Sequence, residues 1–173
     1  MTRTITIRRA TIADAFRLGE IGGTTFTETF GHLYPPEDLA AFLRSAHSPE
    51  VWHRRLQESH IAVWLVEVDD GVCAGYASAG PCKLPVPDLE SNAGELFQLY
   101  VRGPFHGRRL GSRLLTAALA WLESRGFDPL YIGVWSRNES AQRLYARFGF
   151  TRYAEYEFPV GTQRDHEYIL RRA

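Results

Sequence analysis

Three arginines and two glycines lie close together in the chain, directly after an apolar segment: Gly107, Arg108, Arg109, Gly111 and Arg113. Arginine donates charge-assisted hydrogen bonds that suit phosphate oxygens, and glycine lets a backbone approach a ligand closely. Backbone N–H groups in the first turn of a helix lack partners and carry the positive end of the helix dipole. The stretch therefore predicts a diphosphate-binding turn at the start of a helix.

The residues on either side predict the elements that hold this turn. The apolar segment Glu95–Val101 precedes it and is typical of a strand. After it, Leu110, Leu114, Ala118 and Leu122 recur at four-residue spacing and form the apolar stripe of a helix. A strand, a glycine-containing turn and a helix thus follow one another without interruption.

Patterns elsewhere predict the remaining elements. A capping sequence at Thr11–Asp14 begins a helix that runs toward Thr24, and prolines mark the start of two more. Helices are expected at 11–24, 37–44, 48–56 and 139–148. Strands are expected at 5–7, 61–68, 72–79, 95–101, 130–135, 152–158 and 166–170. Residues 81–92 contain three prolines and no periodicity, which predicts a loop that shapes the site.

The composition favours one globular domain that spans residues 1–173, with 45% hydrophobic and 23% charged residues. The formal net charge is zero, which argues against a dedicated nucleic-acid binder. No apolar run approaches the roughly 20 residues of a membrane span, and the N-terminus lacks a signal-peptide pattern. We therefore expect a cytoplasmic protein that does not bind membranes, with Cys73 and Cys82 as free thiols.

Two segments resemble the GCN5-related N-acetyltransferase (GNAT) superfamily. The family motif is Gln or Arg, two residues, Gly, one residue, then Gly or Ala, and it opens the helix that binds the pyrophosphate of acetyl-CoA. Here the positions read His106-Gly-Arg-Arg-Leu-Gly111, so His106 replaces Gln or Arg and Arg109 replaces the first motif glycine. The segment from Tyr131 to Phe150 resembles the second family motif, a strand, an Asn, a short helix with Tyr and a closing Gly-Phe.

The resemblance covers nearly the whole chain and implies an α+β fold, an α/β/α sandwich. Its mixed, mostly antiparallel sheet has about seven strands, splays between strands 4 and 5, and is flanked by four or five helices. Several segments are similar to the bacterial spermidine/spermine acetyltransferase (PaiA-like) branch. They are Phe26–His32, Pro36–Leu43, Gly133–Asn138 and Asp165.

The function implied by the resemblance is acetyl transfer from acetyl-CoA to a primary amine of a small molecule. Transfer is direct, in a ternary complex, and a polyamine is the first candidate acceptor. The alternatives are an acetyltransferase of peptide or protein amines and a non-catalytic acyl-CoA-binding module. No metal is implied, and a homodimer is expected because dimers are common in the family.

The resemblance also implies the residues that bind acetyl-CoA. Strand residues pair with the pantetheine arm, the turn holds the pyrophosphate, and the second motif contacts the pantetheine amides. These residues are Leu99, Tyr100, Val101, His106, Gly107, Arg108, Arg109, Leu110, Gly111, Ser112, Asn138, Ser140 and Tyr145. Asn138 is also a good helix N-cap, so it has a structural interpretation as well.

Two residues are the implied catalytic groups. Tyr145 is the candidate acid that protonates the departing thiolate, and its alternative role is packing against the sheet. Glu95 matches the position of the catalytic glutamate in histone-acetylating members, and it is either a base or an anchor for a cationic substrate. Alternation along the strand places Glu95 on one face with Phe97, Leu99 and Val101.

The expected acceptor site lies between Glu95 and the early helices. Phe30, Trp135 and Glu95 are expected to bind the substrate there, and Glu28 is expected to contribute an acidic side chain. A carboxylate such as Glu28 on a helix is also compatible with simple solvation.

Overall fold

The computed structural model describes residues 4–69 and 71–173 and contains a seven-stranded sheet with the order β1-β2-β3-β4-β5-β7-β6. Its strands are β1 Ile5–Arg9, β2 Ala62–Val68, β3 Val72–Pro81, β4 Gly94–Val101, β5 Leu130–Trp135, β6 Thr151–Val160 and β7 Gln163–Arg172. Every neighbouring pair is antiparallel except β4 and β5, which are parallel. The predicted hairpin around Gly161 is confirmed as β6–β7.

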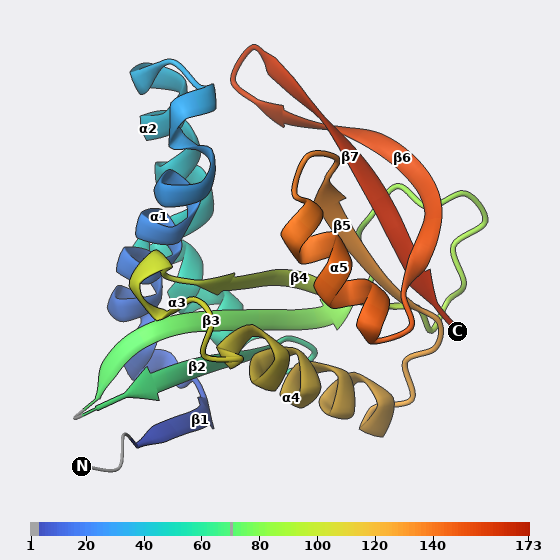
Figure 1. The fold of residues 1–173 in the computed structure, drawn as a ribbon, viewed down its shortest axis with the longest axis horizontal. Coiled ribbons are helices and arrows are strands. Elements are labelled where there is room, and N and C mark those ends of the chain that lie inside the picture. Colours follow the sequence, from blue (N-terminus) through green and yellow to red (C-terminus); the bar gives the residue numbers. More distant parts are fainter. Residues whose placement is uncertain (1–3, 70) are drawn as a thin grey trace.

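Helices cover both faces of the sheet (Figure 1). They are α1 Ala15–Phe30, α2 Pro36–His47, α3 Pro49–Gln57, α4 Leu110–Ser124 and α5 Glu139–Arg147, with short 3₁₀ turns at 12–14, 31–33 and 103–105. We call the side covered by α4 and α5 the α4 face and the side covered by α1, α2 and α3 the α1 face. The predicted α/β/α sandwich is therefore confirmed.

The sheet opens between β4 and β5. These strands pair only from Gly94–Leu96 to Leu130–Ile132. Beyond Leu96 and Ile132 the two strands diverge, and Figure 1 shows β5 turning away from β4. The predicted splay between strands 4 and 5 is therefore present, and its mouth lies at the carboxyl ends of both strands.

A β-bulge lies in β4 at the start of the splay. Ser78 pairs with Gln98, whereas the next residue of β3, Ala79, pairs with Leu96. Phe97 is therefore an extra residue without a partner on β3. A bulge bends its strand and shifts the alternation of side chains by one.

This bulge makes the predicted facing of β4 wrong. Glu95 and Phe97 lie on the α1 face together with Tyr100. Leu99 and Val101 pack on the opposite side, in the core beneath α4. Alternation counted from the sequence alone predicts Glu95, Phe97, Leu99 and Val101 on one face.

The first helix is longer than predicted, because it continues past Gly22 to Phe30 rather than ending near Thr24. A Cβ at Gly22 would lie 2.4 Å from His47 Nδ1, and one at Gly19 would lie 2.8 Å from the His47 carbonyl oxygen. These glycines therefore allow α1 to approach the end of α2 closely rather than ending the helix.

Candidate active site

The turn before α4 has the backbone of a glycine-rich loop even where glycine is absent. Arg109 is the N-cap of α4 and is left-handed, with φ 59° and ψ 19°. Gly107 has a φ of 77°. A left-handed conformation costs a residue with a side chain roughly 1–2 kcal/mol. Arg109 thus keeps the conformation that glycine adopts without this cost.

The first turn of α4 points free N–H groups out of the helix end. The first helical hydrogen bond at this end runs from the Arg113 N–H to the Arg109 carbonyl. The N–H groups of Leu110, Gly111 and Ser112 precede it and have no partner within the helix. Together with the positive helix end, they suit an anionic group.

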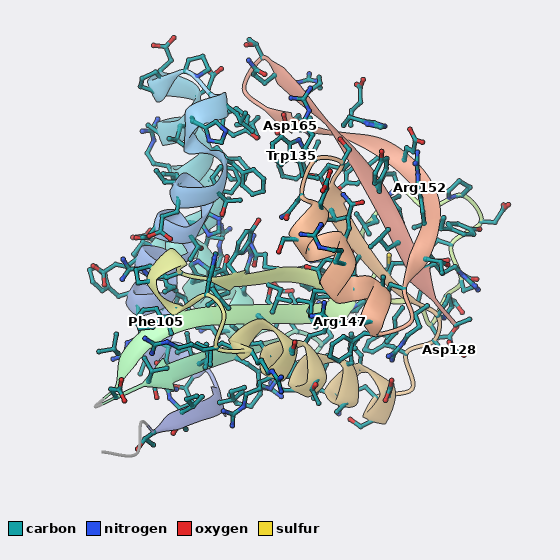
Figure 2. The ribbon with its side chains drawn as sticks, in the orientation of Figure 1. Phe105, Asp128, Trp135, Arg147, Arg152 and Asp165 are labelled. Carbon is teal, nitrogen blue, oxygen red and sulfur yellow. The ribbon has the colours of Figure 1, made fainter. Side chains whose placement is uncertain are left out.

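A cavity of about 470 Å³ opens over this turn on the α4 face, and we call it the α4-face cavity. Of the sequence-predicted residues, it is lined by Leu99, Val101, His106, Gly107, Arg109, Leu110, Gly111, Ser112, Asn138, Ser140 and Tyr145. Arg143 and Arg147 also line it, and sequence reasoning missed them. Their four-residue spacing on α5 was the available signal, since such residues share one side of a helix. Figure 2 labels Arg147 on α5.

Two of the predicted phosphate arginines lie elsewhere. Arg108 stacks its guanidinium 5.2 Å above the Phe105 ring, and neither Arg108 nor Arg113 lines the α4-face cavity. His106 donates its Nε2 hydrogen to the Val101 carbonyl at 2.6 Å, which ties the turn to the end of β4. In this structure the cation at the turn is therefore Arg109, joined from α5 by Arg143 and Arg147.

The backbone of β4 shows which groups face the splay. Arg102 donates its N–H to the Ala74 carbonyl of β3, and the Tyr100 carbonyl oxygen also lies against β3, beside Gly75. Because successive residues of a strand direct their polar groups to opposite sides, the backbones of Leu99 and Val101 face away from β3, into the splay.

Tyr100 therefore does not fit its predicted place among the cofactor-binding residues. Its backbone pairs toward β3, and its side chain lies on the α1 face, in edge contact with Phe30. The bulge at Phe97 is the physical reason, because it sets which residues of β4 turn their backbones toward β5.

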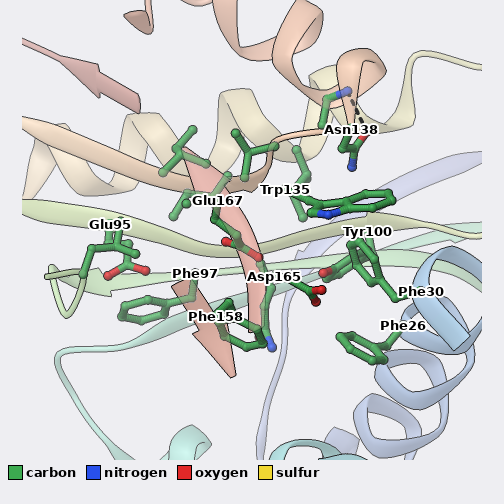
Figure 3. A pocket seen from close by; sticks show the side chains of 18 of the residues that line it. Phe26, Phe30, Glu95, Phe97, Tyr100, Trp135, Asn138, Phe158, Asp165 and Glu167 are labelled. Carbon is green, nitrogen blue, oxygen red and sulfur yellow. Dashed lines mark hydrogen bonds between the residues drawn. The ribbon is translucent and has the colours of Figure 1, made fainter. Parts of the chain in front are cut away.

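A second cavity, of about 410 Å³, lies on the other side of the splay and is called the α1-face cavity. Its aromatic walls come from α1, α2 and three strands. They include Phe26, Phe30, Phe42, Phe97, Tyr100, Trp135 and Phe158 (Figure 3). Phe30 packs edge-on against Trp135 with ring centroids 5.6 Å apart. The structure thus brings together the two aromatic residues predicted to form the acceptor site.

Glu95 is a buried carboxyl group at one end of this cavity (Figure 3). Burial raises the pKa of Glu95 to about 7. The backbone N–H of Lys83 donates to Glu95 Oε2 at 2.7 Å and opposes this rise, because it favours the charged form. The hydrogen bond also fastens the loop after β3 to β4. Glu95 therefore lies in the predicted cavity and titrates near neutral pH.

We expect Glu95→Gln to remove a pH-dependent loss of stability. Because the pKa is about 4.5 in the unfolded chain and about 7 when folded, the folded protein holds more protons in between. Stability contributed by the neutral carboxyl is then lost as pH rises through this window. Chemical denaturation from pH 4 to 8 should show the free energy of unfolding of the variant increasing relative to that of the native protein as pH rises. The difference should reach a few kcal/mol. Glu139→Gln, on an exposed carboxylate, is the control. Parallel stability curves would contradict the expectation.

Two further carboxylates line the α1-face cavity from β7. Tyr34 donates its hydroxyl hydrogen to Asp165, and Tyr156 donates to Glu167 Oε2 at 2.6 Å. Figure 2 shows Asp165 beside Trp135, in the space between α1 and the last strands. Among the sequence features only Asp165 had been noted. Alternation along β7 puts Asp165 and Glu167 on one face, a signal that was available for both.

Glu28 is not part of either cavity, contrary to its predicted role in substrate binding. Its carboxylate accepts the Gly103 N–H at 3.3 Å and lies 3.6 Å from the Arg102 guanidinium. Phe26 and Phe30 share the cavity side of α1 at four-residue spacing, and Glu28 falls between them on the other side. Glu28 thus ties α1 to the end of β4.

The two cavities meet at the splay, where four residues line both of them: Leu99, Asn138, Ala141 and Tyr145. Asn138 caps α5 by accepting the Ala141 N–H at 3.1 Å, so its structural role is present. Tyr145 is 5% exposed. Burial raises the pKa of its phenol, and the nearby negative charge of Glu167 raises it further. The phenol therefore stays protonated at neutral pH.

The described residues hold no cluster of three or more His, Cys, Asp or Glu side chains that could bind a metal ion. Across the same 4–69 and 71–173 ranges, no helix has the length and hydropathy to cross a membrane.

Solved structures share this architecture. PaiA N-acetyltransferase from Thermoplasma acidophilum in complex with coenzyme A superposes with a TM-score of 0.77 at 20% identity, over 97% of this chain and 98% of that one. YncA from Salmonella typhimurium with its cofactor acetyl-CoA gives a TM-score of 0.68 at 22% identity, over 97% and 92% of the two chains. At these identities the similarity confirms the fold.

Sequence relatives extend the similarity. An uncharacterised N-acetyltransferase from the pepI 3′ region of Lactobacillus delbrueckii subsp. lactis is 30% identical over 153 residues, which is 88% of each chain. Phosphinothricin N-acetyltransferase from Streptomyces viridochromogenes is 30% identical over 155 residues, covering 86% of this chain and 75% of that protein. The family model described as acetyltransferase (GNAT) family matches residues 25–150. The chain therefore belongs to the GNAT acetyltransferase family.

Proposed function

We propose that this protein transfers an acetyl group from acetyl-CoA directly to a primary amine of a small molecule, within one ternary complex. The observation that carries this proposal is the pair of cavities on opposite faces of the sheet, which share Leu99, Asn138, Ala141 and Tyr145. An amine in one cavity and a thioester in the other meet in the splay. No covalent acetyl-enzyme is needed.

The α4-face cavity suits acetyl-CoA. The free N–H groups of Leu110 to Ser112 and the guanidinium of Arg109 would hold the diphosphate. The Leu99 backbone and the Val101 N–H would pair with the pantetheine arm as an added strand does. Asn138 and Ser140 would contact the arm from α5. Acetyl-CoA supplies the activated acyl group, and the protein supplies position and protons.

Three further roles fall to residues at the splay and in the α1-face cavity. The Leu99 N–H would polarise the thioester carbonyl. Tyr145 would give a proton to the departing sulfur. Glu95 would bind an ammonium group of the acceptor from the far end of the α1-face cavity, in its charged form.

A polyamine is the acceptor that we propose first. Carboxylates at three positions, Glu95, Asp165 and Glu167, match an acceptor with several ammonium groups. Aromatic faces such as those of Phe30 and Trp135 attract cations by about 0.5–2 kcal/mol each. The similarity in sequence segments to the spermidine/spermine branch supports the same choice.

A second acceptor class is favoured by two cations in the same cavity. Arg55 from α3 and Lys83 from the loop after β3 both line it, with the Lys83 ammonium 5.3 Å above the Phe97 ring. They suit an amine that also carries a carboxylate, as free amino acids and peptides do. The relative named phosphinothricin N-acetyltransferase supports keeping this class.

An acceptor panel tests the proposal. The protein is incubated with acetyl-CoA and with diamines, polyamines, amino acids, peptides or simple alkylamines, and free CoA is followed with a thiol reagent. We expect turnover with polyamines and much less with simple alkylamines. Preference for amino acids or peptides would support the second class instead. Tight acetyl-CoA binding with no turnover on any amine would identify a non-catalytic acyl-CoA-binding module.

Arg109→Gly is expected to make the protein more stable and its coenzyme A binding weaker. Glycine removes about 1 kcal/mol of left-handed strain, so the melting temperature should rise. Loss of a charged hydrogen bond to phosphate should weaken coenzyme A about tenfold. Thermal unfolding and calorimetric titration measure the two effects. The control, Arg108→Ala, lies outside the cavity and should leave affinity unchanged. Native affinity in Arg109→Gly would remove Arg109 from the phosphate site.

We also propose that the protein works in the cytoplasm as a homodimer. Both cysteines, Cys73 and Cys82, are free, which agrees with a reducing compartment. Dimerisation rests on the family alone. Light scattering coupled to size-exclusion chromatography gives the oligomeric state directly.

A further inference from the structure

Glu167 is the carboxylate that faces the open part of the splay. On β7 it pairs with Trp135 of β5, beyond Ile132, the last residue of β5 that pairs with β4. Glu95, in contrast, pairs with Tyr131, where the two strands are still joined. Figure 3 shows Glu95 at one end of the cavity and Glu167 nearer its middle.

Three strands build the position of this carboxylate. Tyr156 on β6 donates its hydroxyl hydrogen to Glu167 Oε2 at 2.6 Å. On β5, a Cβ at Gly133 would lie 2.7 Å from the Tyr156 hydroxyl and 3.5 Å from the same Glu167 oxygen. The missing side chain of Gly133 therefore makes room for the Tyr156–Glu167 pair, in the wall of the splay.

We infer that Glu167 receives the reacting end of the acceptor and takes the proton that its ammonium group must lose, whereas Glu95 anchors the distal end. This inference rests on the proposed function. The amine that approaches the splay from the α1 face passes Glu167 before it reaches the shared residues Leu99 and Tyr145. Burial raises the pKa of the Glu167 carboxyl by more than the Tyr156 hydrogen bond lowers it, and the Asp165 charge adds to the rise. The raised pKa makes the Glu167 carboxylate a better proton acceptor.

The acceptor nitrogen loses two protons as the ammonium becomes an amide. The ammonium gives one proton to Glu167 and becomes a neutral amine. Its lone pair forms the N–C bond to the acetyl carbon while the C–S bond breaks. Sulfur takes a proton from Tyr145, and the phenol regains it from the second proton that nitrogen must lose. Glu167 then releases its proton to water.

Glu167→Gln tests the inference, because glutamine keeps the size and can still accept the Tyr156 hydrogen bond. At pH 7 we expect kcat/KM for the amine to fall at least tenfold, with the KM for acetyl-CoA unchanged. The deficit should shrink toward pH 9, as more acceptor arrives already neutral. Glu95→Gln is expected to raise the amine KM with little change in kcat.

Other titrating groups face this part of the cavity, and their effect on the pH profile must be distinguished from that of Glu167. They are Tyr34, His47, Arg55, Lys83, Glu95, Tyr100, Tyr145, Tyr156 and Asp165. Burial raises the pKa of the tyrosines and lowers that of His47 to about 4, so the tyrosines stay protonated and His47 stays neutral from pH 6 to 9. Because Glu95 titrates near 7, the Glu167→Gln profile is also measured in a Glu95→Gln background.

An active native protein whose Glu167→Gln variant keeps native kcat/KM at pH 7, or loses the same factor at every pH, overturns the inference. A native protein that acetylates no amine overturns the proposed function itself. Should Glu167→Gln fail to fold, Tyr156→Phe removes one hydrogen bond to the carboxylate. It should alter the pH profile if Glu167 is the proton acceptor, and an unaltered profile would contradict the inference.

Discussion

Replacing Leu99 with proline is expected to lower kcat/KM for acetyl transfer about 100- to 1,000-fold, the usual effect of removing one donor to a developing oxyanion. The Leu99 backbone faces the splay rather than β3, because Arg102 and Tyr100 direct theirs to β3. Proline removes the Leu99 N–H, which makes no bond to β3, so the ladder between β3 and β4 keeps its hydrogen bonds. It also replaces the leucine side chain and fixes φ, and the fold is therefore checked separately. Steady-state kinetics, with circular dichroism to confirm the fold, measure the effect.

Leu99→Ala is the matched control, since it shortens the side chain and retains the N–H. We expect this variant to keep most of the native activity. If proline and alanine reduce kcat/KM equally, the side chain rather than the N–H is responsible, and the role assigned to Leu99 fails. Tyr100→Pro serves as a second reference, because it removes an N–H that faces β3 and should weaken the fold.

Tyr145→Phe is expected to lower kcat about 100-fold while acetyl-CoA affinity stays close to native. Tyr145 lines both cavities, and its buried phenol stays protonated at neutral pH. Phenylalanine preserves the ring and removes only the hydroxyl group that carries the acidic hydrogen. The departing thiol has a pKa of about 8.5, which limits the loss to this range. Single-turnover rates and calorimetric titration separate chemistry from binding.

Tyr168→Phe provides the comparison, because Tyr168 packs against the same core cluster and lines neither cavity. It should leave both quantities near native. An equal loss of turnover and of acetyl-CoA affinity in Tyr145→Phe would instead show that the tyrosine acts by packing.

Much of the fold followed from local patterns. The stripe from Leu110 to Leu122 and the hairpin around Gly161 were predicted within a few residues of their ends. The length of α1 was not, because the helix was expected to end near Thr24, and the close packing of His47 against Gly22 cannot be read from the sequence. The position of the bulge at Phe97 was also hidden, because it depends on the pairing of β4 with β3 rather than on the composition of either strand.

The residues of the candidate site that belong to one local motif were predicted. Those that reach the site only through the helix faces and the strand order were missed. The turn around Arg109 and the helix of Tyr145 were located from their motifs. Glu28 was misplaced although the spacing of Phe26 and Phe30 already defines the inner side of α1. Glu167 reaches the splay only because β7 lies between β5 and β6, an order that the sequence does not show.

A crystal structure with coenzyme A bound tests the central claim most directly. The account predicts diphosphate oxygens within about 3.5 Å of the N–H groups of Leu110, Gly111 or Ser112, with the sulfur in the splay beside the Tyr145 hydroxyl. Coenzyme A bound elsewhere, or a turn closed by the Arg109 side chain with the sulfur far from Tyr145, would contradict it.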